Sequence, residues 1–442
     1  MNLNIQNLRE KYLKNEITVD EVILSIKNKI EKTKDYNIWI YTLSEDELLP
    51  YLENLKTKKV EDLPLYGIPF AIKDNIDLKN IPTTAACKEY KYIPKKSAFV
   101  VEKLIEAGAI PIGKTNLDQF ATGLVGTRSD YGECKNSIDP SYISGGSSAG
   151  SAVSVALDMV SFSLGTDTAG SGRVPAAFNN LIGIKASKGL ISTSGVVPAC
   201  RSLDCVTIFT KTLGEAKKVF DVANIYDEED IYSRVYTPTK KKTKENFTFA
   251  IPKKDQLKFF EDEEAKQLYF DAVEKFESLG AKAIEIDFTP FIQSANLLYS
   301  GPWVTERYIA IKDIITKNEQ FVNPTVRTIV KSGAKIDAIN YFESEYTLKK
   351  NRKYVDKILK KFDFILTPTT GTIYKIDEVN ANPIQLNTNL GYYTNFMNLL
   401  DLSAIALPAG FRKNKLPFGV TIVGDKFDEE LLFDYSFKYL GE

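Results

Sequence analysis

The 442-residue chain contains no histidine, which excludes every catalytic arrangement that depends on an imidazole. A serine or cysteine nucleophile needs a base to accept its proton, and Ser-His-Asp and Cys-His sites use histidine for this purpose. The four cysteines also lack the Cys-x-x-Cys spacing of zinc sites, and without histidine few zinc ligands remain. We therefore expect no metal and no cofactor. If the chain is a serine enzyme, we expect a lysine as its base.

The sequence has neither an excess of charge of one sign nor a long apolar run. With 57 basic and 58 acidic residues, the net charge of −1 gives no bias toward nucleic acid or a membrane surface. No apolar stretch approaches the ~20 residues that a membrane span needs, and the polar start is not typical of a signal peptide. The composition predicts a cytoplasmic protein that binds neither nucleic acid nor membranes, with reduced and largely buried cysteines.

The chain does have a Gly/Ser-rich segment, residues 144–175, that is interrupted by apolar residues. Glycine and serine gather around Ser147 and again around Ser171, and the residues between them are apolar at helical spacing. Flexible linkers share the Gly/Ser composition, but a linker would not alternate loop, helix, strand and loop. We expect each serine to lie at a strand–helix junction, where outward-pointing backbone N–H groups stabilise a developing oxyanion.

Lys73 stands at the end of a short predicted strand in which Ile68, Phe70 and Ile72 alternate with other residues. Most lysines at strand ends are solvated surface charges. A lysine that acts as a base must be neutral, and burial beside apolar strand residues lowers its pKa toward that state. Lys73 is therefore a candidate for the base that the absence of histidine requires.

The strand with Lys73, the Gly145–Ser148 loop and the segment Gly165–Pro175 resemble the amidase signature family, which hydrolyses amides with a Ser-Ser-Lys triad and no metal. The resemblance implies that Ser171 is the nucleophile, Ser147 the bridging serine after a cis peptide bond, and Lys73 the base. It also implies an oxyanion hole made of backbone amides, which are those of Thr168, Ala169, Gly170 and Ser171.

Further segments resemble the allophanate hydrolases of this family. They are Gly113–Gly132, Gly195–Cys205, Gly301–Tyr308, Tyr393–Asp401 and Leu407–Phe411. This resemblance implies that Tyr299 and Arg307 recognise the substrate and that Gly123 lies in a loop lining its pocket. It implies a small-molecule substrate, allophanate, as the partner, and it is compatible with a homodimer.

Three departures from this pattern change no expected catalytic group. Ala149 replaces a serine or glycine of the family's loop, and Lys185–Lys188 replaces a Lys-Pro-Thr-Arg sequence. Many allophanate hydrolases also carry an additional C-terminal domain, and we expect the amidase domain here without it.

The surroundings of Arg307 favour a carboxylate ligand on physical grounds as well. Gly301 and Pro302 break an apolar helix, and proline suits the first position of a new one. We expect Arg307 in the early turns of that helix, whose positive end favours an anion. A guanidinium binds a carboxylate through two parallel hydrogen bonds. The alternative is a surface salt bridge with Glu306 or Asp313.

Three short motifs point to other enzymes. Gly108–Thr115 fits the phosphate-binding pattern GxxxxGK[ST], but that loop follows a strand, whereas Ala98–Ala107 is predicted as a helix and Ala109–Ile112 as the strand. Gly146–Gly150 fits the nucleophile elbow GxSxG, which needs a histidine that this chain lacks. Ser332–Lys335 fits SxxK without the companion Lys-Thr-Gly and is interpreted as a chance match.

The order of elements predicts an α/β fold. We expect one amidase domain over residues 1–442, with N-terminal helices to residue 60, a catalytic core at 61–215, an exposed connection at 227–246 and the remainder at 247–442. Strand-like runs that alternate with helices in this last part are Phe247–Ile251, Ala283–Phe288, Phe362–Thr367, Ile405–Leu407 and Phe418–Val423. The resemblance implies a large twisted mixed sheet surrounded by α-helices.

The sequence thus predicts an amidohydrolase that cleaves the terminal C–N amide bond of allophanate to give ammonia and carbon dioxide. Three alternatives stay open at this point. The first is a glutaminase-type subunit of a tRNA-dependent amidotransferase, which shares the same signature. The others are an amidase for another small amide and a non-catalytic binding module, although all three triad residues are present.

Overall fold

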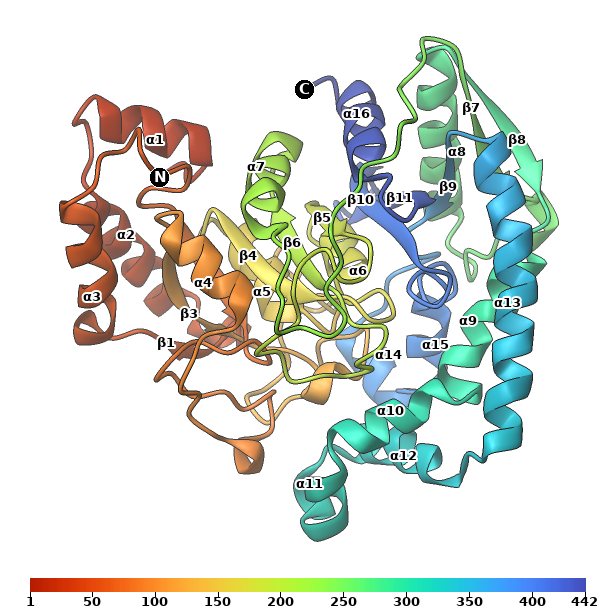
Figure 1. Ribbon diagram of the computed structural model, residues 1–442, viewed down its shortest axis with the longest axis horizontal. Coiled ribbons are helices and arrows are strands. Elements are labelled where there is room, and N and C mark those ends of the chain that lie inside the picture. The colour runs from red at the N-terminus through yellow and green to blue at the C-terminus, as the bar shows by residue number, and fades with distance from the viewer.

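The computed structural model describes residues 1–442 and is built around one mixed sheet of 11 strands in the order β1-β3-β2-β4-β6-β5-β10-β11-β9-β7-β8 (Figure 1). Strand β2 is parallel to β3 and β4, and β7 is parallel to β8 and β9, whereas the other pairs are antiparallel. The strands are β1 Trp39–Thr42, β2 Pro69–Lys73, β3 Ile110–Thr115, β4 Phe162–Thr166, β5 Ile182–Lys185, β6 Val206–Thr210, β7 Phe247–Pro252, β8 Ala281–Ile286, β9 Phe364–Pro368, β10 Leu402–Phe411 and β11 Pro417–Asp425.

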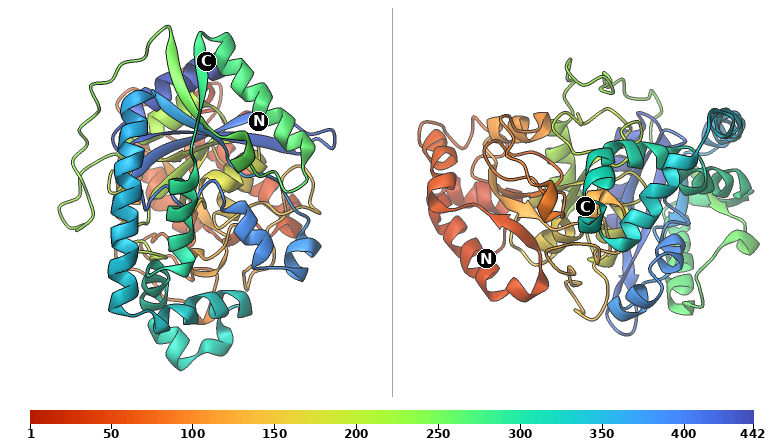
Figure 2. Two further views of the ribbon diagram at one scale, coloured as in Figure 1. Left: turned by 90° about the vertical axis from the view of Figure 1, so that its right-hand side faces the viewer. Right: turned by 90° about the horizontal axis from the view of Figure 1, so that it is seen from below.

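Helices surround this sheet, and the two views in Figure 2 show the long α13 running along one side of the molecule. In Figure 1 the N-terminal helices lie at the left with β1, and α8 lies at the right with β7 and β8. The α-helices are α1 Ile5–Leu13, α2 Val19–Lys32, α3 Glu45–Lys56, α4 Phe99–Glu106, α5 Ala149–Ala156, α6 Arg173–Phe178, α7 Leu213–Ala223, α8 Glu263–Ser278, α9 Thr289–Ser300, α10 Trp303–Ala310, α11 Lys312–Lys317, α12 Pro324–Ser332, α13 Ala338–Lys361, α14 Ile376–Ala381, α15 Gln385–Leu390 and α16 Glu429–Leu440. The predicted α/β class is confirmed.

The N-terminal segment forms the predicted helices and one strand that was not predicted. Helix α2 begins with a capping box in which the Thr18 hydroxyl accepts from the Glu21 N–H and the Glu21 carboxylate accepts from the Thr18 N–H. The apolar side of α2 is buried. The prediction of helices alone to residue 60 is wrong at β1, where aromatic and β-branched residues favour a strand and pair with β3 at the sheet edge.

The predicted strands are present, with bounds that pairing has shifted. The run expected at 283–288 is β8, which starts two residues earlier because Ala281 pairs with Phe247 of β7. The GxxxxGK[ST] motif at 108–115 lies mostly within β3 and follows α4, so it forms a strand and not a phosphate-binding loop. No helix or strand occurs in the connection at 227–246, as predicted.

An apolar cluster holds the α9–α13 segment against the sheet. Phe288 and Phe291 stack at 4.7 Å between ring centroids, and both contact Phe396 edge-on. Val355 of α13 and Leu402 of β10 are buried in the same cluster. This packing fixes the position of α9 and of α10, which follows it.

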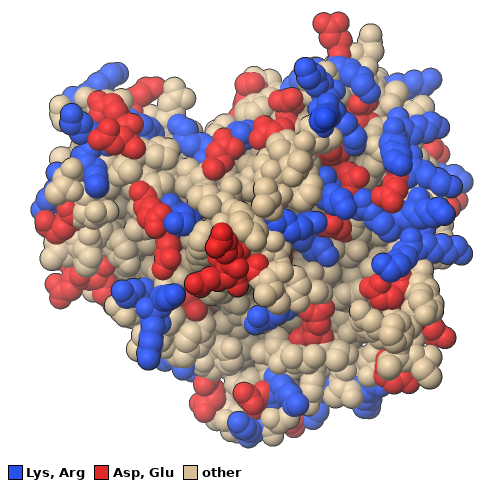
Figure 3. Space-filling model, in the orientation of Figure 1, with Lys and Arg blue, Asp and Glu red and all other residues tan.

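On the face that Figure 3 shows, acidic and basic side chains are both widespread. Figure 3 shows blue side chains along the right-hand edge, where α13 lies, and the exposed lysines of this helix are Lys349, Lys350, Lys353, Lys357, Lys360 and Lys361. We interpret these side chains as a solvated helix face. None of the helices is both long and apolar enough to span a bilayer.

Candidate active site

Lys73 lies at the edge of the sheet where the parallel strands β2 and β4 both end. Because parallel neighbours finish at the same edge, the last residue of β2 meets Thr166, the last residue of β4. Lys73 Nζ donates to Thr166 Oγ1 and to Ser147 Oγ, both at 2.7 Å. The lysine is fully buried and has no carboxylate within ion-pair distance. Burial lowers its pKa to about 7, so near neutral pH a large share of Lys73 is uncharged.

Ser147 lies two residues before α5, after a cis peptide bond between Gly146 and Ser147. The prediction that Ser147 lies at a strand–helix junction is wrong, because a loop and not a strand precedes it. The backbone N–H of Asp118 donates to the Ser147 carbonyl at 3.2 Å, which helps to fix the loop that contains Ser147. Ser147 is completely buried, with its hydroxyl facing the lysine.

Ser171 occupies the expected junction, between the end of β4 and the start of α6. Its Oγ donates to the carbonyl of Gly123 at 3.4 Å, and the N–H of Ser148 donates to the Ser171 carbonyl. Gly123 therefore lies in a loop beside Ser171. A Cβ atom at Gly123 would come within 2.5 Å of Asp118 Oδ2, so the close approach requires glycine.

The loop between β4 and α6 presents free backbone amides. The N–H groups of Thr168, Ala169 and Ser171 donate to no protein acceptor. Gly170 differs from expectation, because its N–H donates to Asp167 Oδ1 at 2.7 Å. Three amides, and not four, are therefore available for an oxyanion. Gly170 has a φ of +131°, and a Cβ atom there would collide with Thr394.

Buried polar side chains fix the shape of this loop. Arg173 donates to both oxygens of Asp167, at 2.8 and 2.9 Å, and neither side chain is exposed. Burial alone would raise the pKa of Asp167, but the Arg173 guanidinium overcomes this and lowers it. Asn398 Nδ2 donates to the carbonyls of Asp167 and Thr168, at 2.6 and 3.1 Å. Because C=O and N–H of a trans peptide point in opposite directions, Asn398 also orients the N–H groups of Thr168 and Ala169.

Arg307 is buried in α10 and has no anionic partner. Its Nη1 donates to Thr122 Oγ1 at 3.0 Å, and its Nη2 donates to Tyr299 Oη at 3.4 Å. The alternative salt bridges are absent, because Glu306 accepts from Ser202 and Asp313 pairs with a lysine. The guanidinium carbon also lies 5.2 Å from the centre of the Tyr299 ring.

The predicted position of Arg307 within its helix is wrong. Pro302 is the N-cap of α10 and not its first residue, and Arg307 falls in the last turn of this eight-residue helix. The positive end of α10 therefore does not support an anion at Arg307, because that effect is confined to the first turn. Attraction for an anion at this position comes from the guanidinium itself.

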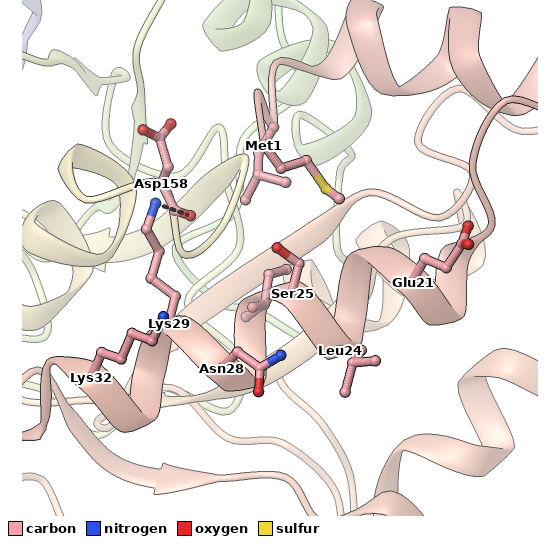
Figure 4. Close-up of a pocket in the computed structure, with 10 residues that line it drawn as sticks. Met1, Glu21, Leu24, Ser25, Asn28, Lys29, Lys32 and Asp158 are labelled. Atoms are coloured by element: carbon pink, nitrogen blue, oxygen red, sulfur yellow. Dashed lines mark hydrogen bonds between the residues drawn. The ribbon is translucent and has the colours of Figure 1, made fainter.

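A pocket of about 450 Å³, away from the Lys73 site, is lined mainly by residues of α2 (Figure 4). Lys29 of α2 spans it and donates to the carbonyl of Asp158 at 3.3 Å. The labelled side chains include no buried base beside a nucleophile, and none belongs to the Lys73 site. The four cysteines are buried and unpaired, and no three side chains of metal-ligand type come together.

Fold and site together define a hydrolase of the α/β class. The amidase family model matches residues 21–433. The chain therefore belongs to the amidase family.

Several known proteins resemble this chain. Urea amidolyase of Saccharomyces cerevisiae is 46% identical over 91% of this chain and 22% of its own length. The urea amidolyase of Lachancea kluyveri is also 46% identical, over 94% of this chain and 23% of its own length. The chain thus spans about a quarter of the length of these curated relatives. A glutamyl-tRNA(Gln) amidotransferase subunit of Legionella pneumophila is 35% identical over 93% of this chain and 91% of its own length.

The solved structures add a close match in three dimensions. A structure of Kluyveromyces lactis allophanate hydrolase has a TM-score of 0.94 and 43% identity, and covers 99% of this chain and 72% of its own. This agreement over nearly all residues confirms the expected amidase signature fold with its large mixed sheet.

Proposed function

We propose that this chain hydrolyses the terminal amide bond of allophanate through Lys73, Ser147 and Ser171. The observation that carries the proposal is the hydrogen bond of 2.7 Å between the fully buried Lys73 and Ser147. A lysine in this setting has the lowered pKa that a base needs. The similarity to an allophanate hydrolase over 99% of the chain supports the choice of substrate.

In the first step Ser171 Oγ attacks the terminal carbonyl carbon of allophanate. Its proton passes to Ser147, and the Ser147 proton passes to neutral Lys73. The carbonyl oxygen becomes an oxyanion, to which the free amides of Thr168, Ala169 and Ser171 donate.

The tetrahedral intermediate then loses its terminal nitrogen. Charged Lys73 returns a proton through Ser147 to this nitrogen, the C–N bond breaks, and ammonia leaves. Water adds to the acyl group on Ser171, again giving up a proton along the same relay. The ester bond breaks, Ser171 regains its proton, and the released carboxylated carbamate decays to ammonia and carbon dioxide.

Arg307 and Tyr299 recognise the carboxylate of the substrate in this proposal. A buried guanidinium without an anionic partner is costly, and a substrate carboxylate supplies the missing charge. The Nε atom of Arg307 is buried and has no hydrogen-bond partner within the protein, so its hydrogen-bonding capacity is unused. Planar guanidinium and carboxylate groups form two parallel hydrogen bonds.

Replacing Arg307 tests the identity of the substrate. We expect Arg307→Ala to lower kcat/KM for allophanate by about tenfold to a thousandfold, since a desolvated charge pair contributes roughly 2 to 5 kcal/mol. Turnover of biuret, a neutral analogue, should fall much less. Arg307→Lys should restore only part of the loss, because an ammonium cannot form the planar two-point contact. Equal losses on both substrates would contradict recognition of a carboxylate.

A glutaminase-type role is the second candidate, because the Legionella amidotransferase protein matches over 91% of its own length. Ammonia release from allophanate, biuret, malonamate and glutamine separates the two functions. Activity on glutamine that requires copurifying proteins would favour the amidotransferase role, whereas activity of the isolated chain on allophanate favours our proposal.

We further propose that the chain assembles as a homodimer and works in the cytoplasm. Light scattering of the purified chain measures its mass against the 49.6 kDa of one copy. Fractionation of the source cells tests the location.

A further inference from the structure

A cavity of about 470 Å³ lies beside the candidate active site and is lined in part by residues of α9, α12 and α15. Its walls are hydroxyl, amide and small apolar side chains, with one cation and no Asp or Glu. The lining residues are Arg128, Ala295, Asn296, Tyr299, Ser300, Ile329, Ser332, Ile384, Asn387, Thr388 and Asn395. The single cation in this lining favours a ligand that carries a negative charge over a neutral one.

The cavity shares its walls with the site. Tyr299 lines it and accepts from Arg307. Asn387 lines it as well, and its Oδ1 accepts from the N–H of Leu124 at 2.8 Å. Leu124 follows Gly123, whose carbonyl accepts from the Ser171 hydroxyl. The cavity is therefore separated from the nucleophile by a single loop.

Arg128 is the cation of this cavity, and it is 3% exposed. Its Nη1 donates to the carbonyl of Thr122 at 2.9 Å and its Nη2 to the carbonyl of Pro383 at 2.7 Å. Its Nε has no partner, and no carboxylate lies within ion-pair distance. The nearby Asp118 carboxylate is taken up by backbone N–H groups, including that of Arg128 itself.

Two buried guanidinium groups therefore donate hydrogen bonds to the same residue, Thr122. Arg307 donates to the Thr122 hydroxyl, and Arg128 donates to the Thr122 carbonyl. Neither has an anionic protein partner. Asn395 adds a second unused polar group, because its Oδ1 is buried without a partner while the side chain lines the cavity. Buried polar groups that the protein leaves unpaired are those that a ligand satisfies.

We propose that this cavity is the entrance and outer binding site for an anionic substrate, and that Arg128 is the cation that attracts its carboxylate before Arg307 binds it. The ligand class is a small carboxylate that also carries amide-type hydrogen-bonding groups. A fixed charge of one sign in a cleft concentrates ligands of opposite sign and raises the rate of association. This inference rests on the proposed function, since allophanate is such an anion.

The experiment compares Arg128→Gln and Arg128→Lys with a control, Lys59→Gln. Lys59 is an exposed lysine that follows α3 in the chain, and its loss changes the net charge as much as Arg128→Gln does. We measure kcat and kcat/KM for allophanate and biuret at ionic strengths of about 0.01 and 1 M, where the Debye length is about 30 and 3 Å. In Arg128→Gln, kcat/KM for allophanate should fall about tenfold at low salt with kcat little changed, and its salt dependence should flatten. Biuret turnover should stay near wild type, and Lys59→Gln should behave as wild type.

A binding measurement separates failure of this inference from failure of the proposed function. Malonate, a carboxylate of similar size, is titrated calorimetrically against each variant, and this readout needs no turnover. We expect its Kd to rise about tenfold in Arg128→Gln and to stay within about threefold of wild type in Arg128→Lys. An unchanged malonate Kd in Arg128→Gln overturns the inference, as does an equal loss of biuret and allophanate turnover. If Arg128→Gln does not fold, a folded Arg128→Lys that loses the salt dependence also overturns it.

Discussion

At the scale of single residues, the site depends on a lysine that the fold keeps out of water. Lys73 has two hydroxyl partners, Ser147 and Thr166, and no carboxylate. Burial lowers the pKa of Lys73, and this effect outweighs the opposing charges of Asp118, Asp204 and Asp167, none of which forms an ion pair with the lysine. In the proposed mechanism, Ser147 carries protons in both directions between this lysine and Ser171.

Removing any member of this relay should abolish most activity without unfolding the chain. We expect Ser171→Ala and Lys73→Ala each to lower kcat by about 10³-fold or more, because each removes a step of covalent catalysis. Ser147→Ala should be severely impaired as well, since the lysine then reaches the nucleophile only through an added water. Ammonia release measures the loss, and circular dichroism checks the fold. Ser154→Ala, a buried serine of α5 outside the site, is the matched control. A folded Ser171→Ala variant with near-normal turnover would contradict the assignment.

The pH dependence of turnover and of stability should both report Lys73. Its folded pKa of about 7 lies below the ordinary value of 10.5. Activity should therefore fall as pH drops below about 7, where Lys73 becomes charged. Between about 7 and 10.5 the unfolded state binds more protons than the folded state, so the free energy of unfolding should rise with pH in that window.

Urea unfolding at several pH values, compared between wild type and Lys73→Met, measures this contribution. The variant should lose the part of the pH slope that Lys73 supplies. Identical slopes in the two proteins would show that the lysine is charged in the folded state.

At the scale of elements, the loop between β4 and α6 is shaped from outside its own sequence. Asn398, more than 200 residues away in the chain, holds the carbonyls of Asp167 and Thr168. Lys185, the last residue of β5, donates in turn to Asn398 Oδ1 at 2.7 Å. The loop is therefore fixed by a hydrogen-bonded chain that crosses from β5 through the segment before β10.

Loss of Asn398 should weaken transition-state binding more than substrate binding. Without it, the Thr168 and Ala169 amides can turn away from the oxyanion. We expect Asn398→Ala to lower kcat by about tenfold to a hundredfold, less than the loss of an oxyanion donor itself, with KM changed little. A purely structural role would instead lower the melting temperature and leave kcat of the folded fraction normal, so kcat is measured well below the transition.

Local patterns in the sequence predicted most elements near the site. Alternation before Lys73 predicted β2, and helical spacing after Ser147 predicted α5, although both elements are buried on more than one side. The edge strand β1 was missed, since four residues are too few to show a clear alternation of apolar and polar side chains. The last-turn position of Arg307 was missed because α10 ends at Ala310 after only eight residues, and no end was predicted for this helix.

At the scale of the whole molecule, no local sequence pattern predicts the contacts between site residues that lie far apart in the chain. Thr166, Arg128 and Asn398 have no distinguishing sequence spacing, and only the sheet register and the long connections bring them to the site. Gly170 shows the same limit, because its N–H is taken by Asp167 through the three-dimensional shape of the loop. Residue types at the centre of the site were predictable, and the partners that hold them were not.

Burial of all four cysteines makes thiol reactivity a measure of global unfolding. Burial raises the pKa of every one of these thiols, which keeps them in the unreactive protonated form. We expect slow labelling of the native chain by an aromatic disulfide reagent at pH 8 and rapid labelling of four thiols in denaturant. Fast reaction of one thiol in the native chain, with unchanged circular dichroism, would contradict uniform burial.

The helices from α9 to α13 form an excursion of the chain between two strands of the sheet, β8 and β9. They supply Tyr299 and Arg307, whereas the proposed proton relay, Lys73, Ser147 and Ser171, lies in the first 171 residues. The proposed relay and the proposed carboxylate-binding pair therefore lie in separate stretches of the chain, although Thr122 of the first stretch accepts from Arg307. In the proposed mechanism, a substitution confined to this excursion changes which amide binds and leaves the proton relay unaltered.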